Sequence, residues 1–180
     1  MELLQSIDTW LFYFFNVTLA NPFFDWFMPI ITNKLTWIPL WLAAAVLLVW
    51  KGGRKGRIFL LALLAAVALT DLVTNQMLKP LVHRARPCAA LENVHLLVRC
   101  IHSYSMPSSH ASNFAALATM FTVYLKKYRW LFWTAALLVA YSRMAVGVHY
   151  PSDVLAGLAV GYLSAQLGVR IYRRFGASAA

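Results

Sequence analysis

Three short segments of the sequence each combine basic or imidazole side chains with a helix-start or helix-end signal. They are Lys79-x6-Arg86-Pro87, Pro107-Ser108-Ser109-His110 and Ser142-Arg143-x5-His149-x3-Asp153. Cations and the free N–H groups of a helix start can neutralise phosphate oxygens, and Arg does so bidentately. Two histidines can supply a nucleophile and an acid/base, and a carboxylate can hold the tautomer of one of them. The three segments therefore indicate phosphoryl transfer.

Taken singly, these residues have simpler structural explanations. Lys79, Arg84 and Arg86 would suit cations at a membrane interface, and Asp153 would suit a carboxylate stabilised by a helix dipole. Arg143 fits such an explanation less well, because cations inside apolar stretches are rare and mostly functional. The seven-residue step predicts Lys79 and Arg86 on one face of a continuing helix, about two turns apart. Separate structural roles do not explain why three helix ends bring ionisable groups to one side.

The histidine and aspartate side chains of these motifs could instead bind a metal ion. His110, His149 and Asp153 are suitable ligand types. The neighbouring lysine and arginines would repel a metal cation. We therefore predict no metal and no other cofactor.

The composition describes the surroundings in which this chemistry takes place. Of the 180 residues, 61% are apolar and 12% are charged, and the mean hydropathy is +0.64. A soluble domain has about 45–50% apolar and about 25% charged residues. The composition therefore excludes an ordinary soluble domain and a disordered chain, and it predicts one all-α integral membrane domain over residues 1–180.

Five stretches are predicted to be membrane-spanning helices, which need about 20 mostly apolar residues. They are residues 35–50, 58–78, 109–125, 130–148 and 154–171. The first is the shortest and contains Pro39, but Trp37 and Trp41 suit a membrane interface. The span-containing part, residues 35–174, is the predicted catalytic core.

The first 34 residues have a different pattern. Apolar side chains from Leu3 to Phe15 repeat at helical spacing with polar residues between them, Asn21-Pro22 is a turn signal, and the spacing resumes from Phe23 to Ile31. This pattern favours two amphipathic helices lying in the membrane interface. The alternative is one more spanning helix over residues 10–31, interrupted at Asn21-Pro22.

The basic residues between the spans orient the chain. Lys and Arg cluster at 51–57, 126–129 and 170–174, and five spans put all three clusters on one side. The positive-inside rule makes that side cytoplasmic. The three motifs and residues 1–34 then face outward. A sixth span would move the N-terminus inside without moving the clusters.

Cys88 and Cys100 are the only two cysteines and lie in the same predicted outer loop. An oxidising compartment favours their pairing, and closing a loop of this size contributes roughly 3 kcal/mol in the chain-entropy model. We therefore expect a disulfide that fixes the loop between the first two motifs.

The three motifs, in this order and with this internal spacing, resemble the signature of the type-2 phosphatidic acid phosphatase family. That family also includes vanadium haloperoxidases and bacterial acid phosphatases. The resemblance runs from about Asp71 to Gly161, roughly half of the chain. One position departs from the family pattern: Ser109 stands where the second motif usually has glycine, so backbone, side chain or both could contact phosphate there.

The resemblance implies a role for each motif residue. His149 would attack phosphorus and form a phosphohistidine, Asp153 would orient His149, and His110 would protonate the leaving oxygen and then activate water. The phosphoryl oxygens would be held by Lys79, Arg86, Ser108, Ser109 and Arg143. Asp71, two helical turns before Lys79, would serve either as a supporting residue of the site or as a structural hydrogen-bonding group.

The sequence thus predicts a lipid phosphatase of a bacterial inner membrane with its active site on the outer face. Undecaprenyl diphosphate is the preferred substrate; phosphatidylglycerophosphate, phosphatidic acid and lipid A phosphates are the alternatives. A membrane lipid is the only partner expected, without nucleic acid or a required partner protein. The competing functional class is a protein that binds or transports anionic lipid without hydrolysing it, which would not need the His149–Asp153 pair or His110.

Overall fold

The computed structural model of the chain describes residues 2–176, and all regular elements in this range are helical, which confirms the predicted all-α fold. In chain order the elements are α1 (Glu2–Tyr13), η1 (Phe14–Thr18), α2 (Pro22–Thr32), α3 (Lys34–Trp50), α4 (Gly53–Asp71), η2 (Leu72–Leu78), α5 (Lys79–Val82), α6 (Pro87–Ala90), α7 (Ser109–Tyr124), η3 (Lys126–Tyr128), α8 (Arg129–Ala145) and α9 (Pro151–Phe175). The segments η1 and η2 are π-helical, and η3 is a 3-10 turn.

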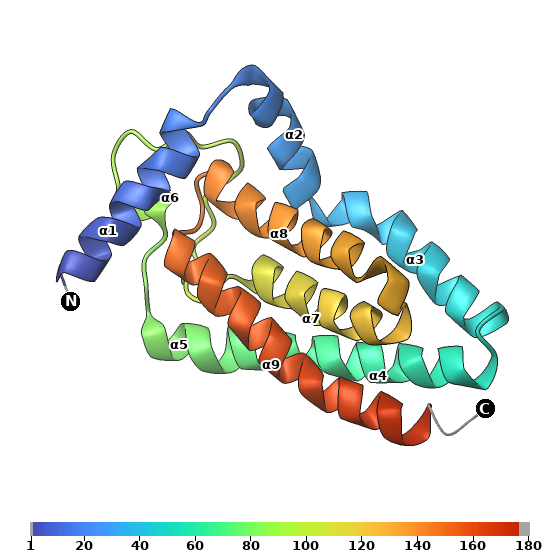
Figure 1. Cartoon of the computed structure of the whole chain (residues 1–180). Coiled ribbons are helices and arrows are strands. Elements are labelled where there is room, and N and C mark those ends of the chain that lie inside the picture. The colour runs from blue at the N-terminus through green and yellow to red at the C-terminus, as the bar shows by residue number, and fades with distance from the viewer. Residues whose placement is uncertain (1, 177–180) are drawn as a thin grey trace.

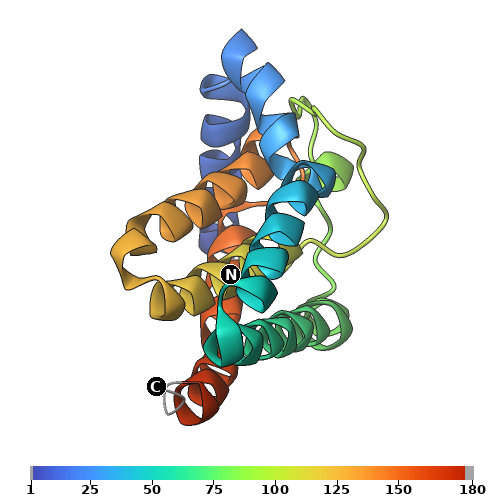
Figure 2. The ribbon, with the colours of Figure 1, turned by 90° about the vertical axis from the view of Figure 1, so that its right-hand side faces the viewer.

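Helix α7 lies at the centre of a bundle and packs against α4, α8 and α9 (Figure 1). The loop that follows α5, the start of α9 and helix α1 gather at one end. The α3–α4 turn, the α7–α8 turn and the end of α9 lie at the other (Figure 1). Viewed from this second end, α8 and α4 lie on opposite sides of the bundle, with α3 toward the viewer (Figure 2).

Small residues let α7 and α9 approach closely. A Cβ atom on Gly161 would lie 2.0 Å from the Ser112 carbonyl oxygen, and one on Gly157 would lie 2.6 Å from the Ser108 carbonyl oxygen. The two glycines are four residues apart and therefore lie on one face of α9, the arrangement that membrane helices use for close packing. This contact fixes the start of α7 against the start of α9.

The distribution of side-chain size is that of a protein in lipid. Alanines occupy much of the interior, including Ala111, Ala115 and Ala116, which are fully buried. Leucines on the same bundle face outward: Leu155 is 66% exposed and Leu163 is 65% exposed. In a water-soluble helical bundle the large apolar side chains face the interior. Here small side chains fill the interior and large apolar side chains face outward, as expected for helices in lipid.

The five predicted spans coincide with α3, α4 with η2, α7, α8 and α9, to within a few residues at each end. By length and composition alone, two helical runs within residues 2–176 can cross a membrane, Gly53–Ala90 and Pro151–Phe175. Helices α7 and α8 have 16 and 17 residues, fewer than a single span usually needs. The protein is thus an integral membrane protein, and the count of five spans stays a prediction.

The N-terminal region forms helices on both sides of the predicted turn. Asn21 caps α2 by accepting a hydrogen bond from the Phe24 N–H at 3.0 Å, and Pro22 begins the helix. At its other end α2 meets α3 at an angle of 50°, and the bent pair together is long and apolar enough for a third span. The predicted turn at Asn21-Pro22 therefore separates α1 and η1 from α2. Helix α2 continues toward α3 instead.

Candidate active site

The three motifs meet at the end of the bundle where α7 and α9 begin. The Ser108 N–H donates to the Asp153 carbonyl oxygen at 2.9 Å, which joins the start of α7 to the first turn of α9. Arg86 from the preceding loop donates to the Val148 carbonyl oxygen at 3.0 Å. Lys79 and His110 lie within electrostatic range of this group. The eight predicted site residues therefore come from three separate segments and share one end of the molecule.

The expectation that Lys79 and Arg86 lie on one face of a continuing helix is wrong. Helix α5 ends at Val82, and His83 has a left-handed backbone with φ of 52°. Arg86 follows in extended conformation as the residue before α6. The chain therefore turns out of the helix between the two cations, and Arg86 reaches the site from a loop.

His149 and Asp153 form the buried centre of the site. His149 is 2% exposed and Asp153 is completely buried. The Asp153 Oδ2 accepts the Tyr150 backbone N–H at 2.9 Å and lies 3.4 Å from the His149 Nδ1, and the Oδ1 accepts from the Arg84 Nη1 at 2.8 Å. Because both carboxylate oxygens are held, the position of Asp153 beside the imidazole is fixed by the fold.

The contacts of His149 determine which ring nitrogen carries the lone pair and which carries the proton. Arg86 Nη1 lies 3.0 Å from the His149 Nε2. A guanidinium can only donate, so Nε2 must accept and the ring proton belongs on Nδ1. Nδ1 is the nitrogen that faces the Asp153 carboxylate. The imidazole therefore presents its nucleophilic lone pair toward the cations.

Burial and positive neighbours lower the pKa of His149 well below its usual value of 6.5. Burial is the largest cause, followed by the charges of Arg143, Arg86 and Lys79. His149 lies in the turn between α8 and α9, outside both helices. The lowered pKa leaves the imidazole uncharged at neutral pH, with its single ring proton on Nδ1, the form that a nucleophile requires.

Arg86 is held by the loop that precedes α7. Its Nε donates to the Ser103 carbonyl oxygen at 2.9 Å, and its Nη2 donates to the Ser103 Oγ at 2.9 Å and the Tyr104 carbonyl oxygen at 3.3 Å. A disulfide between Cys88 and Cys100 closes the same loop. These links place the guanidinium against His149 although it comes from an irregular segment.

Several polar atoms at this end have no protein partner. Arg143 Nη1 donates to the Thr32 Oγ1, but its Nε is buried without a hydrogen-bond partner among residues 2–176. The Ser108 Oγ is likewise buried without a partner in that range. Lys79 is 9% exposed. Buried polar groups are almost always hydrogen-bonded, so the Arg143 Nε and the Ser108 Oγ are suited to an oxygen-rich ligand, and the Lys79 charge favours an anionic one.

The Ser109 hydroxyl is already engaged within the protein. It donates to the Asn75 Oδ1 at 2.6 Å, and the Asn75 Nδ2 donates to the Asp71 Oδ1 at 2.7 Å. Asn113 Nδ2 also donates to that oxygen, at 3.3 Å. The Ser109 N–H lies at the helix start, where the helix itself offers no acceptor. The geometry therefore favours the backbone N–H of Ser109 as its phosphate contact, and it makes Asp71 a hydrogen-bonding support for this position.

His110 lies where the polar site meets an apolar groove. The groove has a volume of about 580 Å³ and runs between α3, α4 and α7. Its polar end contains Lys34, Ser109, His110 and Asn113. The rest is apolar, with Trp37, Ile38, Trp41, Leu48, Leu63, Val67, Phe114 and Leu117 among its lining residues. A long hydrocarbon chain fits such a groove while its polar end stays at the site.

The structure adds a second carboxylate that the sequence did not indicate. Arg84 lies between Asp153 and Asp8 of α1, and its Nη2 donates to the Asp8 Oδ2 at 2.6 Å. Asp8 also accepts from the Ser152 N–H at 2.9 Å and from the Ser152 hydroxyl. Helix α1 is thereby tied to the first turn of α9. The sequence also did not indicate Thr32, the partner of Arg143. Neither Asp8 nor Thr32 belongs to a recognisable local sequence pattern.

Within residues 2–176, no group of three or more His, Cys, Asp or Glu side chains is placed to hold a metal ion. His149 and Asp153 instead each contact an arginine side chain, Arg86 and Arg84 respectively. The expectation of a metal-free reaction remains a prediction.

Comparison with known proteins agrees with the motifs. The family model described as the PAP2 superfamily matches residues 59–177. The chain is 33% identical to a lipid A 4'-phosphatase of Bacteroides thetaiotaomicron, over 89% of this chain and 75% of that protein. It is 32% identical to an undecaprenyl-diphosphatase of Sulfolobus acidocaldarius, over 77% of this chain and 65% of that protein. The crystal structure of a transmembrane PAP2-type phosphatidylglycerolphosphate phosphatase from Bacillus subtilis superposes with a TM-score of 0.75 and 25% identity, over 97% of this chain and 88% of that chain. The chain therefore belongs to the PAP2 superfamily.

Proposed function

We propose that this protein is a lipid phosphatase that transfers a phosphoryl group from a lipid headgroup to His149 and then to water. One observation supports this function most directly. His110 lines the polar end of an apolar groove and lies within electrostatic range of Arg143 and of His149, which is buried beside Asp153. A ligand with a phosphate at one end and a hydrocarbon chain at the other matches both parts of this surface.

In the first step the His149 Nε2 attacks phosphorus. A nitrogen–phosphorus bond forms as the bond from phosphorus to the leaving oxygen breaks, and His110 gives its proton to that oxygen, so that the lipid alcohol leaves from a monophosphate and the lipid monophosphate leaves from a diphosphate. Asp153 faces the Nδ1 proton and stabilises the positive charge that develops on the ring. Lys79, Arg86 and Arg143 neutralise the charge on the phosphoryl oxygens, as metal ions do in other phosphatases.

In the second step a water molecule displaces His149 from phosphorus. His110, now unprotonated, accepts a proton from the water as its oxygen bonds to phosphorus and the nitrogen–phosphorus bond breaks. Inorganic phosphate leaves, and both histidines return to their starting states. The N–H groups at the start of α7 and the Ser108 hydroxyl contact the same phosphoryl oxygens in both steps.

Two lipid classes are the leading substrates. Undecaprenyl diphosphate is the substrate that the sequence predicts, and a relative named undecaprenyl-diphosphatase supports it. Phosphorylated lipid A is supported by relatives named lipid A 4'-phosphatase, which align over 89% and 96% of this chain. Both substrates join a phosphate to a large apolar anchor, so an apolar groove beside a phosphate site is consistent with either class.

The proposal is tested by phosphate release from purified protein in EDTA. The panel contains lipid A, undecaprenyl diphosphate, phosphatidylglycerophosphate, phosphatidic acid and a short-chain water-soluble phosphate. We expect turnover of at least one long-chain lipid at a kcat/KM well above that of the short-chain compound. Binding of lipid without any phosphate release would instead support the non-catalytic class. Activity only after a divalent metal is restored would contradict the metal-free mechanism.

The active site is proposed to face outward from a bacterial inner membrane. Glu92 lies in the loop at the site end, and Gly53 begins α4 at the opposite end. A cysteine at Glu92 should react with a membrane-impermeant thiol reagent in intact cells, and a cysteine at Gly53 should not. The native cysteines are disulfide-bonded and do not interfere. The reverse labelling pattern would place the site on the cytoplasmic leaflet.

A further inference from the structure

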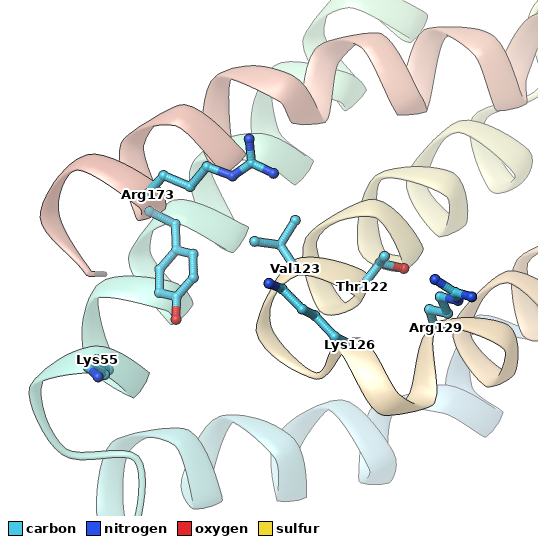
Figure 3. A pocket seen from close by; sticks show the side chains of 7 residues that line it. Lys55, Thr122, Val123, Lys126, Arg129 and Arg173 are labelled. Atoms are coloured by element: carbon cyan, nitrogen blue, oxygen red, sulfur yellow. The ribbon is translucent and has the colours of Figure 1, made fainter. Parts of the chain in front are cut away.

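A second pocket lies at the opposite end of the bundle, away from every proposed catalytic residue. It has a volume of about 520 Å³. Figure 3 shows its lining side chains around the space between the ends of α4, α7 and α9. The lining consists of Lys55, Thr122, Val123, Lys126, Arg129, Tyr172 and Arg173. Four cations from four different helical elements thus surround one pocket.

These four cations lack a compensating acidic side chain. The six acidic residues of the chain are Glu2, Asp8, Asp25, Asp71, Glu92 and Asp153, and none of them lines the pocket. Within residues 2–176 the ion pairs to carboxylates involve Arg84, His95 and His149, and none involves a pocket cation. Four like charges around one space repel one another unless an anion lies between them.

Uncharged groups of the pocket also suit an anion. The Thr122 Oγ1 is buried and has no hydrogen-bond partner among the described residues. It lines the pocket together with Tyr172, so two hydroxyl groups accompany the cations. A ligand with several acceptor oxygens would satisfy the Thr122 hydroxyl and the charges together.

We propose that this pocket binds the phosphate of an anionic phospholipid. Two exposed aromatic side chains contact basic residues at this end: Trp130, 72% exposed, stacks with the pocket residue Arg129, and Phe175, 56% exposed, with Arg174. Exposed aromatic rings beside basic residues mark the membrane–water interface, where a lipid phosphate is present at high local concentration. Under the proposed orientation this is the cytoplasmic leaflet, whereas the pocket itself does not depend on the proposed catalysis.

Membrane orientation alone does not explain this arrangement. The positive-inside rule accounts for basic residues on one side of the membrane. It does not require that Lys55 and Lys126 converge on one pocket while their neighbours Arg54 and Lys127 do not line it. Those two neighbours therefore provide a matched control with the same loss of charge at the same end.

The test measures lipid binding by the full chain in a neutral detergent, which removes the general attraction of an anionic bilayer surface. Phosphatidylglycerol, phosphatidylcholine and inorganic phosphate are titrated separately, and bound molecules are counted by native mass spectrometry. The double variant Lys55→Gln with Lys126→Gln is compared with Arg54→Gln with Lys127→Gln. Phosphate release is recorded in parallel, so a failure of this proposal is distinguishable from a failure of the catalytic one.

We expect the wild-type protein to bind one phosphatidylglycerol molecule at this pocket, with an affinity well above its affinity for phosphatidylcholine. The pocket variant should lose that affinity by roughly 10- to 30-fold, because each cation near a lipid phosphate contributes about 1 kcal/mol. The control variant should change it by less than about 2-fold. Both variants should keep wild-type phosphate release, since none of the four residues touches the catalytic site.

Thr122→Val gives a second measure that leaves the charge and the chain topology unchanged. Loss of the hydroxyl should weaken phosphatidylglycerol binding by about 3-fold. Equal losses in the pocket and control variants, or no loss in the pocket variant, would overturn the proposal. Inorganic phosphate that binds as tightly as phosphatidylglycerol and displaces it from the pocket would also overturn it, because the ligand would then be a soluble anion.

Discussion

The two ends of the bundle both collect cations, but they hold them differently. At the end with His149, Arg86 is 3% exposed and Arg143 is 7% exposed, and hydrogen bonds to the protein fix their guanidinium groups. At the other end Lys126 and Arg173 are exposed, and no carboxylate of residues 2–176 pairs with them. Similar charges are thus held by hydrogen bonds in the interior at one end and exposed without a carboxylate partner at the other.

This difference is the one expected between the proposed reacting site and the proposed binding site. Stabilising a transition state requires charges that are already in place, because reorganisation during the reaction is costly. Attracting a lipid headgroup requires only charge and space. The presence of Asp153 and Asp8 at the first end fits this division, since carboxylates orient a histidine and an arginine there.

Removal of the proposed nucleophile should have the largest effect and tests whether the two ends of the bundle have separate roles. His149→Ala should abolish turnover of every substrate, by roughly 10,000-fold or more, because the proposed mechanism then lacks its phosphoryl acceptor. Lipid binding at the basic pocket should be unchanged. Phosphate release and phosphatidylglycerol binding, measured on the same preparation, check both halves. Appreciable turnover by His149→Ala would show that the reacting group lies elsewhere.

A smaller effect is expected when the histidine stays but loses its orienting carboxylate. Asp153→Asn should lower kcat by roughly 100- to 10,000-fold, because an amide no longer holds the ring proton on Nδ1. Phosphate affinity should change little, since the cations remain in place. The inhibition constant for inorganic phosphate measures that affinity. A large loss of phosphate affinity with unchanged kcat would show that Asp153 serves binding instead.

The sequence predicted the parts of this site that lie within short motifs. His149 and Asp153 are four residues apart, and the helix start that places them is signalled by Pro151. The helical segments also followed from apolar length and spacing. These features depend only on residues close together in the sequence, so they can be predicted without knowledge of the fold.

Pairings between distant segments could not be predicted in this way. Asp8 meets Ser152 across 144 residues, and Thr32 meets Arg143 across 111. Neither pairing produces a local pattern, because each depends on how α1 and α2 dock on the bundle. The π-helical segment η2 and the left-handed His83 likewise redirect the chain after Lys79, which is why Arg86 lies off the expected helix face.

Two glycines of α9 test whether precise packing matters at one end more than at the other. A Cβ atom on Gly157 would lie 2.6 Å from the Ser108 carbonyl oxygen, and one on Gly168 would lie 2.8 Å from the Ala62 carbonyl oxygen. Each change to alanine should destabilise the protein by about 1–3 kcal/mol. Gly157→Ala should also lower kcat by roughly 10- to 100-fold, because it displaces the start of α7.

The contrast between the two glycine variants is the informative result. Thermal unfolding in detergent should show similar losses of stability for Gly157→Ala and Gly168→Ala. At a temperature where both are folded, Gly168→Ala should retain kcat within about 3-fold of wild type. Equal kcat losses in the two variants would contradict the view that only the site end requires fixed geometry.

The smallest catalytic effect is expected from the carboxylate farthest from the reacting atoms. Asp8→Asn removes the charge that holds Arg84, which in turn holds Asp153. We expect kcat to fall by roughly 10-fold, equivalent to about 1.4 kcal/mol, with KM nearly unchanged. Glu2→Gln is the matched control on α1. A raised KM at unchanged kcat would assign Asp8 to substrate binding.

The central claim, that His149 forms the phosphoryl intermediate, is tested most directly by trapping that intermediate. In His110→Ala an activated aryl phosphate can still transfer its phosphoryl group, because its leaving group departs without a proton, but the attacking water has lost its base. We predict an acid-labile, base-stable phosphohistidine that accumulates in His110→Ala, maps to His149 by mass spectrometry, and is absent from the double variant with His149→Ala. A phosphoryl group mapped to any other residue would contradict the account.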